Sequence, residues 1–305
     1  MKKGKLLKGG VRGQSAFLIP SLGIAFATFL LFWLYPNLSS FLLAFQDMQG
    51  QWSTINFTQF FESLTATDGD LKISALNTLL YFSAGVFIRL PLVVFVCYFL
   101  YKKIWGYRFF RIMFYMSAII PVVALTGIFK EFIASMGPLG KLCDMLGIPL
   151  ANEGLLAQVS TATPTILFYE IWTCFASCIL LINGGMSRIP TEIIESAKIE
   201  GCGPFREIVQ FIIPLIWPTL STLIILSCTS ILSAGANVLL LQPDNQYHTS
   251  TISYWMFSQM YGNGNYGGTG RYGIVSATGL CFTAVVVPFA LIVKWLLEKI
   301  PAVEY

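Results

Sequence analysis

Side chains that could catalyse a reaction are scarce in this chain. Its single histidine is His248, whereas metal sites and catalytic triads built on histidine need partner residues of matching type. The phosphate-binding pattern G-x-x-x-x-G-K-[S/T] does not occur, because the segment Gly137–Lys141 reads GPLGK and has the wrong spacing. The sequence therefore predicts a non-catalytic protein that binds no metal, cofactor or ATP by itself.

Two charged residues lie inside long apolar runs. Arg89 and Glu170 each interrupt such a run at a similar, central position. A charge in the middle of a membrane is costly, so these side chains should face protein or water, and they are candidates for function. They could pair as a structural clamp or line a polar cavity, and the sequence leaves both interpretations open.

Small polar residues recur in a later apolar run. Ser227, Ser230 and Asn237, with Ala234 between them, are spaced to lie on one face of a helix. That face either contacts a solute or packs closely against a neighbouring helix. Trp172 could stack on a solute or serve as a packing residue. The candidate solute path therefore comprises Arg89, Glu170, Trp172, Ser227, Ser230 and Asn237.

The elements that carry these residues are predicted to be transmembrane helices. Hydrophobic residues make up 55% of the chain and charged residues 11%, with a mean hydropathy of +0.70, whereas soluble domains carry about 25% charged residues. Apolar stretches of about 18 residues or more can span a bilayer. We expect an all-α polytopic membrane protein with six spans: Ala16–Tyr35, Ile73–Tyr101, Ile112–Phe129, Val159–Ile182, Ile212–Leu241 and Gly273–Leu297.

Lysine and arginine residues predict the orientation, because they accumulate in short cytoplasmic segments. One side holds Lys2, Lys3, Lys5, Lys8, Arg12, Lys102, Lys103, Arg108, Arg111, Arg188, Lys198, Arg206, Lys294 and Lys299. The other side holds Lys72, Lys130, Lys141 and Arg271. Both termini should be cytoplasmic, and the net charge of +4 is explained by topology without a nucleic-acid partner.

One predicted cytoplasmic loop, residues 186–212, mixes charged and apolar residues. Its first part interleaves the apolar residues Ile193, Ile194, Ala197 and Ile199 with the charged residues Glu192, Glu195, Lys198 and Glu200. This pattern is compatible with a short amphipathic helix. Gly201, Gly203 and Pro204 should end that helix, and a second one can begin at Phe205. The loop is either a docking element or a solvated connector.

The same loop resembles a known signature. Its residues ESAKIEG, then nine residues, then FIIP resemble the pattern E-A-A, three residues, G, nine residues, I-x-L-P of permease subunits of bacterial binding-protein-dependent ABC importers. The matching positions are Glu195, Ala197, Gly201 and Pro214, and the replaced ones are Ser196, Phe211 and Ile213. The replacements preserve size or apolarity.

Further segments resemble the carbohydrate-uptake branch of that family, in particular its maltose-type or glycerol-phosphate-type first permease. These segments are FLIPSLGIAFATFLLFWLYP, NTLLYF, RFFRIMFYMSAIIPVVA, INGGMSRIPTEIIESA and RYGIVSA. The resemblance implies the type I permease fold of ABC importers. Residues 1–15 would then be a basic cytoplasmic N-terminus, 16–297 the permease domain and 298–305 a cytoplasmic tail.

The resemblance also implies a function and partners. A coupling loop formed by Ile194, Glu195, Ser196, Ala197, Ile199, Gly201 and Pro214 would dock on a cytosolic ATPase dimer that binds ATP and Mg. Glu195 would make a polar contact, Gly201 the turn, and Ile194 or Ile199 the apolar contact. A second permease and an external solute-binding protein would complete the importer in the bacterial cytoplasmic membrane, for a sugar, an oligosaccharide or a sugar derivative.

Two alternative classes remain open from the sequence. A secondary transporter driven by an ion gradient should show inverted repeats and broken helices around a site at the midplane. A membrane scaffold without transport activity would leave Arg89, Glu170 and the loop pattern unexplained. Dependence of uptake on ATP hydrolysis separates an importer from the first alternative.

Overall fold

The computed structural model describes residues 22–47, 49–66, 69–147, 154–234, 236–261 and 271–300. Within these ranges the chain is built from helices and the turns between them, and the only extended pairing is an isolated antiparallel bridge between Gln46 and Trp52. The predicted all-α fold is confirmed.

The elements follow one another in a fixed order, with π-helices and one 3-10 helix labelled η. They are η1 (Leu30–Leu34), α2 (Tyr35–Ala44), α3 (Ile55–Thr65), α4 (Asp70–Ala84), η2 (Gly85–Arg89), α5 (Leu90–Tyr101), α6 (Tyr107–Ile119), α7 (Val122–Ile133), α8 (Pro138–Met145), α9 (Val159–Met186), α10 (Thr191–Ile199), α11 (Pro204–Glu207), η3 (Ile208–Ile212), α12 (Ile213–Leu215), α13 (Trp217–Thr229), η4 (Ile231–Ser233), α14 (Ala236–Leu241), α15 (Ile252–Tyr261) and α16 (Tyr272–Glu298).

Several of these elements are long and apolar enough to cross a membrane. Among the described residues they are Leu22–Ala44, Asp70–Tyr101, Val122–Met145, Val159–Met186 and Tyr272–Glu298, with a sixth if the bent pair Pro204–Leu215 and Trp217–Thr229 forms one span. Three of them contain the predicted second, fourth and sixth spans. The predicted start of the first span lies outside the described residues, and its helix continues beyond Tyr35 to Ala44.

The predicted third span, Ile112–Phe129, is wrong as a continuous helix. Helix α6 ends at Ile119, and Ile120 and Pro121 adopt extended backbone with ψ of 132° and 134°. Proline has no N–H, and its ring disfavours helical backbone at the preceding residue. The chain therefore turns at Pro121 and begins the separate helix α7 at Val122.

The predicted fifth span, Ile212–Leu241, is interrupted twice. The helix bends by 75° between Leu215 and Trp217, where Pro218 cannot donate the backbone hydrogen bond that would continue the helix. Helix α13 then ends at Thr229, and the extended backbone of Ala234, with ψ of 137°, separates η4 from α14. Ser227 and Asn237 therefore do not lie on one continuous helix face, contrary to the prediction.

Each of the three described π-helices precedes a proline. The pairs are η1 with Pro36, η2 with Pro91 and η3 with Pro214. The residue just before each proline donates its N–H to the carbonyl five residues earlier: Tyr35 to Leu30, Leu90 to Gly85 and Ile213 to Ile208. In an α-helix the proline ring would clash with the carbonyl four residues before it. The wider turn accommodates the ring while the helix continues.

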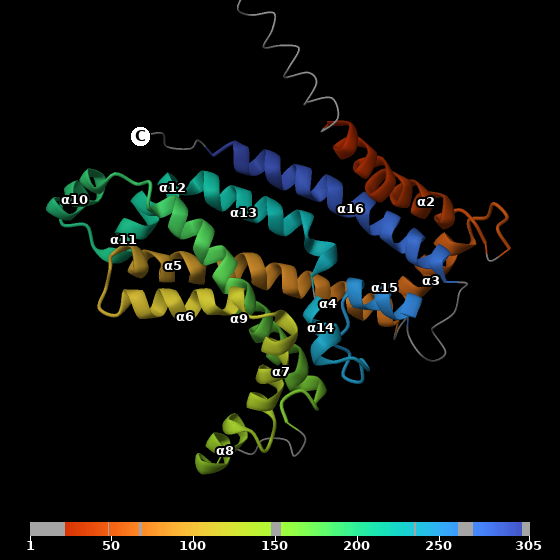
Figure 1. Cartoon of the computed structure of the whole chain (residues 1–305), viewed down its shortest axis with the longest axis horizontal. Helices are drawn as coiled ribbons and strands as arrows, with labels where there is room; N and C mark the ends of the chain where they lie inside the picture. Colours follow the sequence, from red (N-terminus) through yellow and green to blue (C-terminus); the bar gives the residue numbers. More distant parts are fainter. Residues whose placement is uncertain are drawn as a thin grey trace, which may run out of the picture.

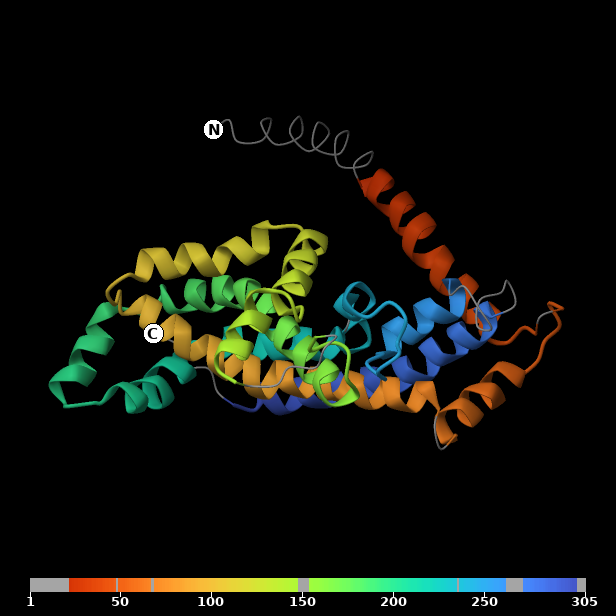
Figure 2. The ribbon, with the colours of Figure 1, turned by 90° about the horizontal axis from the view of Figure 1, so that it is seen from below.

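The helices form an elongated bundle (Figure 1). Helix α5 packs on α9 and α6, and α16 packs on α2, α3 and α13. Helices α10 and α11 lie at one end of the bundle, whereas α3 and α15 lie at the other (Figure 1). Figure 2 shows the segment that contains α2 leaving the bundle at an angle. The largest buried cluster is formed by residues of α5, α9 and the segment from α10 to α13, so the core joins the end that carries α10 to the middle of the bundle.

Candidate functional site: a polar cavity and a charged loop

A polar cavity of about 170 Å³ lies where α4, η2, α9, α13 and η4 meet. Four of the six residues predicted for a solute path line it: Arg89, Glu170, Ser227 and Ser230. They come from three separate segments of the chain. Ala234 also lines the cavity. It follows η4, where the helical backbone that continues from α13 ends.

Arg89 enters this cavity from the last residue of η2. Its guanidinium group lies against Gly85, where an added Cβ would be 3.4 Å from Nη2. Its Nε is buried and has no hydrogen-bond partner among the described residues. The described ion pairs are Lys102–Glu207 and Lys294–Glu298, so the structure does not form the clamp between Arg89 and Glu170 that the sequence allowed.

Glu170 is instead held by neutral donors. Nδ2 of Asn237 donates to Oε2 of Glu170 at 2.6 Å, and the Cys174 thiol donates to Oε1 at 3.7 Å. The break at Ala234 lets α14 pack on α9, which brings Asn237 to this carboxylate. A direct hydrogen bond to a carboxylate fixes its orientation, so Asn237 positions Glu170 at the cavity wall.

The bond between Asn237 and Glu170 predicts how two substitutions combine. The destabilisation caused by Glu170→Ala and Asn237→Ala should be non-additive, with an interaction energy of about 0.5–3 kcal/mol, because each single change already removes the shared bond. The interaction energy between Glu170→Ala and Arg89→Ala should be smaller, since those two side chains form no ion pair. Thermal unfolding of the purified variants in detergent measures both cycles. Equal coupling in the two cycles would contradict the assignment.

Trp172 was a candidate for the solute path or for packing, whereas no role was predicted for Tyr81. Trp172 does not line the cavity and packs near Phe129 and Tyr169, with ring centroids 6.2 Å and 6.1 Å away. Tyr81 lines the cavity, and its buried hydroxyl has no hydrogen-bond partner among the described residues. A usable signal existed, because Tyr81, Gly85 and Arg89 are spaced four residues apart and share one helix face.

The charged loop forms the two short helices that its sequence predicts, α10 and α11. Ile194 and Ala197 are buried at 5% and 1% exposure within the chain's own core, whereas Ile199 is 88% exposed. Glu195 and Ser196 are also exposed. Of the two isoleucines expected to make an apolar contact outside the chain, Ile199 is therefore available, and Ile194 anchors α10 to the bundle.

Gly201 makes the turn between α10 and α11. Its φ of +76° lies in the left-handed region that favours glycine, and an added Cβ would meet nothing within 4 Å. Gly203 has an ordinary φ of −73° and is the N-cap residue before α11. Pro214 lies in α12, just before the 75° bend. The loop pattern therefore includes one turn, at Gly201, and one bend, just after Pro214.

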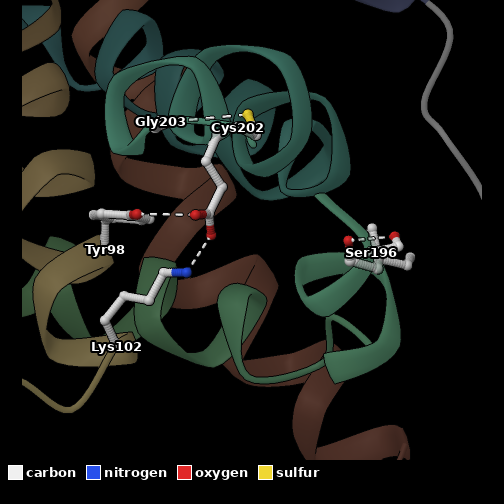
Figure 3. A network of polar contacts seen from close by, with 7 residues as sticks. Tyr98, Lys102, Ser196, Cys202 and Gly203 are labelled. Carbon is white, nitrogen blue, oxygen red and sulfur yellow. Dashed lines mark hydrogen bonds and ion pairs between the residues drawn. The ribbon is translucent and has the colours of Figure 1, made fainter. Parts of the chain in front are cut away.

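The loop also contains a buried carboxylate that was not predicted from the sequence. Glu207, only 2% exposed, ends α11 and accepts a hydrogen bond of 3.1 Å from the Tyr98 hydroxyl. Nζ of Lys102 lies 2.5 Å from its Oε1. Figure 3 shows Tyr98 and Lys102 approaching α11 from the side of α5. The charge pattern predicted only a cytoplasmic position for Lys102, and no role was predicted for Glu207.

Residues 83–300 match the profile of a family described as the binding-protein-dependent transport system inner membrane component. The chain belongs to this family. It is therefore a permease, a multi-pass transport component of the cytoplasmic membrane and not a catalyst. The matched range includes Arg89, Glu170 and the whole loop, and all the residues that line the cavity from η2 to η4.

Curated relatives of this permease cover most of its length. The diacetylchitobiose uptake system permease protein of Streptomyces coelicolor is 24% identical over 91% of this chain and 81% of its own. The multiple sugar-binding transport system permease protein of Streptococcus mutans is 24% identical over 77% of this chain and 81% of its own. The alpha-glucoside transport system permease protein of Rhizobium meliloti is 22% identical over 89% of this chain and 78% of its own.

A solved structure shares the fold of the permease. A chain of a bacterial ABC transporter involved in the import of the acidic polysaccharide alginate superposes with a TM-score of 0.81, at 19% identity, over 94% of this chain and 97% of that one. The same transporter type in complex with an alginate pentasaccharide-bound periplasmic protein gives a TM-score of 0.80. The ABC importer permease fold expected from the loop signature is confirmed.

Proposed function

We propose that this permease forms, with a second permease, the path by which a sugar, oligosaccharide or sugar derivative enters the cell. An external solute-binding protein delivers the solute, and a cytosolic ATPase dimer drives import. The names of the relatives, which concern chitobiose, multiple sugars and alpha-glucosides, support this solute class. The observation that carries the proposal is a polar cavity in the bundle with two buried groups, the Tyr81 hydroxyl and Arg89 Nε, that lack partners in the described chain.

The chemistry of the cavity suits a solute rich in hydroxyl groups. Ser227 and Ser230 donate their own protons to the carbonyls of Leu223 and Leu226, at 2.9 Å and 2.8 Å. Their oxygens therefore keep free acceptor sites for hydroxyl groups of a solute. Arg89 and Tyr81, which also line the cavity, supply donors. A buried polar group without a partner costs stability, so a solute hydroxyl that pairs with Tyr81 or Arg89 recovers this cost.

The loop is proposed to be the docking element for the ATPase, with residues 186–212 as the coupling loop within a permease domain of 16–297. The exposure of Glu195, Ser196 and Ile199 supports this proposal, because they form a mixed polar and apolar face at the end of the bundle. The lysine and arginine pattern supports placing that end, residues 1–15 and residues 298–305 in the cytoplasm. Docking there would couple ATP hydrolysis to alternating access.

Purification of the permease from its native membrane in mild detergent tests this function. We expect a P-loop ATPase and a second six-span subunit to remain bound in fixed ratio. In membrane vesicles, uptake of the solute should follow ATP supply and persist when ion gradients are collapsed. A folded permease recovered alone, together with uptake that follows an ion gradient, would establish a secondary transporter instead.

Glu195→Lys should weaken ATPase association about tenfold, which corresponds to ~1.4 kcal/mol, because the substitution reverses a charge on the exposed face of α10. The amount of permease in the membrane should stay at the wild-type level. Co-purified ATPase per permease measures the effect. The control is Glu298→Lys, which reverses an exposed charge on α16. Equal recovery with both variants would remove Glu195 from the docking face.

A further inference from the structure

The buried pair of Lys102 and Glu207 joins the loop to the second span. Glu207 is 2% exposed and belongs to α11, whereas Lys102 follows α5, and its side chain is 18% exposed. Besides the 2.5 Å ion pair, the Tyr98 hydroxyl donates to the second carboxylate oxygen. Both oxygens of Glu207 are therefore directed at residues of one helix end, 105 and 109 positions away in the chain (207 − 102 and 207 − 98).

The two charges depend on one another. Neither Nζ of Lys102 nor Oε1 of Glu207 has a further hydrogen-bond partner among the described residues. Removing one partner of a buried pair leaves the other as an uncompensated buried charge, which is strongly destabilising. The exposed pair of Lys294 and Glu298, 3.7 Å apart with side chains 52% and 63% exposed, does not have this property.

The position of the pair links the loop to the cavity. Helix α5 begins directly after Arg89, the last residue of η2, which lies at the cavity wall. The covalent path from α11 to the cavity residues of α13 instead passes the 75° bend at Ile216. Packing of Ile194 and Ile208 in the core that includes Val94 and Cys97 gives α10 and η3 a second attachment to α5. The second span thus connects the loop to the cavity without a sharp bend, whereas the covalent path through α13 contains one.

We propose that Lys102 and Glu207 are positioning residues that latch the coupling loop onto the second span. When the ATPase displaces α10 and α11, the latch makes α4, η2 and α5 move with them, and this movement shifts Arg89 at the cavity wall. Without the latch, the ATPase still docks on the exposed face of α10, but its movement reaches the cavity less completely. The inference rests on the proposed function, since it concerns how docking is converted into transport.

The test compares solute transported per ATP hydrolysed in complexes reconstituted into vesicles. Glu207→Gln and Lys102→Met should each lower this ratio about tenfold while ATP hydrolysis per complex stays near the wild-type rate. Lys102→Glu combined with Glu207→Lys should recover much of the ratio, because it restores an ion pair. Glu298→Gln, which breaks the exposed pair, is the matched control and should change nothing. Wild-type ratios in the two single variants, or a loss not recovered by the exchange, would overturn the latch.

Two further measurements distinguish a failure of the proposed latch from a failure of the proposed importer function. Wild-type complexes must first show uptake that depends on ATP. If they do not, the importer function is contradicted, and the result says nothing about the latch. Amide hydrogen exchange in the detergent-purified permease then reports the latch directly. Glu207→Gln should raise exchange in α10 and α11 about tenfold and leave α16 unchanged. Unchanged exchange in α10 and α11 would show that the pair does not hold the loop.

Discussion

Gly201→Val should lower the recovery of the ATPase with this permease by at least about tenfold. Gly201 has a φ of +76°, and a β-branched residue in the left-handed region is strained by about 1–3 kcal/mol. An added Cβ would meet nothing within 4 Å, so the effect comes from the backbone and not from a clash. The turn would rearrange and displace the exposed face of α10 from its docking position.

Gly203→Val is the matched control for this prediction. Gly203 lies two residues further on, has an extended conformation with φ of −73° and ψ of 161°, and also has open space around its Cβ position. Valine is compatible with this conformation, including before a proline. Both variants should reach the membrane at equal levels, and only Gly201→Val should lose the ATPase in co-purification. Equal losses of the ATPase would show that docking requires small residues at both positions and does not depend on the left-handed turn at Gly201.

Ser227→Phe should block transport through the cavity, with uptake reduced by at least about tenfold. The cavity measures about 170 Å³ and Ser227 lines it, whereas a cavity of about 150 Å³ already accommodates benzene. A phenyl ring would therefore fill most of the space that we propose for the solute. The ATPase should remain bound, because Ser227 lines the cavity and does not belong to the exposed face of α10. Uptake and ATPase recovery, measured on one preparation, separate these effects.

Thr222→Phe tests whether a phenylalanine in α13 is harmful for other reasons. Thr222 is exposed on the same helix and does not line the cavity. Its replacement should leave uptake within about twofold of the wild type, since exposed substitutions change stability by roughly 0.5 kcal/mol or less. Normal uptake with Ser227→Phe would remove the cavity from the solute path. Similar losses in both variants would indicate a general packing defect.

The apolar pattern predicted the positions of the membrane spans better than it predicted the breaks within them. The second, fourth and sixth spans were found because lipid requires long apolar helices, and their lengths could be read directly. The third and fifth spans were drawn as straight helices across Pro121 and Pro218. In a membrane helix a proline is tolerated without a break in some places and ends the helix in others, so hydropathy alone does not distinguish these outcomes.

The candidate site was predicted in composition but not in contacts. Arg89, Glu170, Ser227 and Ser230 meet at one cavity, as intramembrane polarity suggested. Periodicity across Ala234 was a misleading reason for including Asn237, which reaches Glu170 because the helix is broken there. Glu207 was missed because a charge in a loop rich in charges carries no signal of burial. Its contacts with Tyr98 and Lys102 depend on the packing of distant segments, which a single sequence does not report.

The π-helix at Gly85–Arg89 sets the rotational phase of the second span. Each extra residue in a helix turns everything beyond it by about 100°, so the single wide turn determines which side chains of α5 face the loop once Tyr81 of α4 faces the cavity. Replacing Pro91 would let this turn tighten to an α-helix. The cavity and the pair of Lys102 and Glu207 would then fall on misaligned faces, although every residue of both was still present.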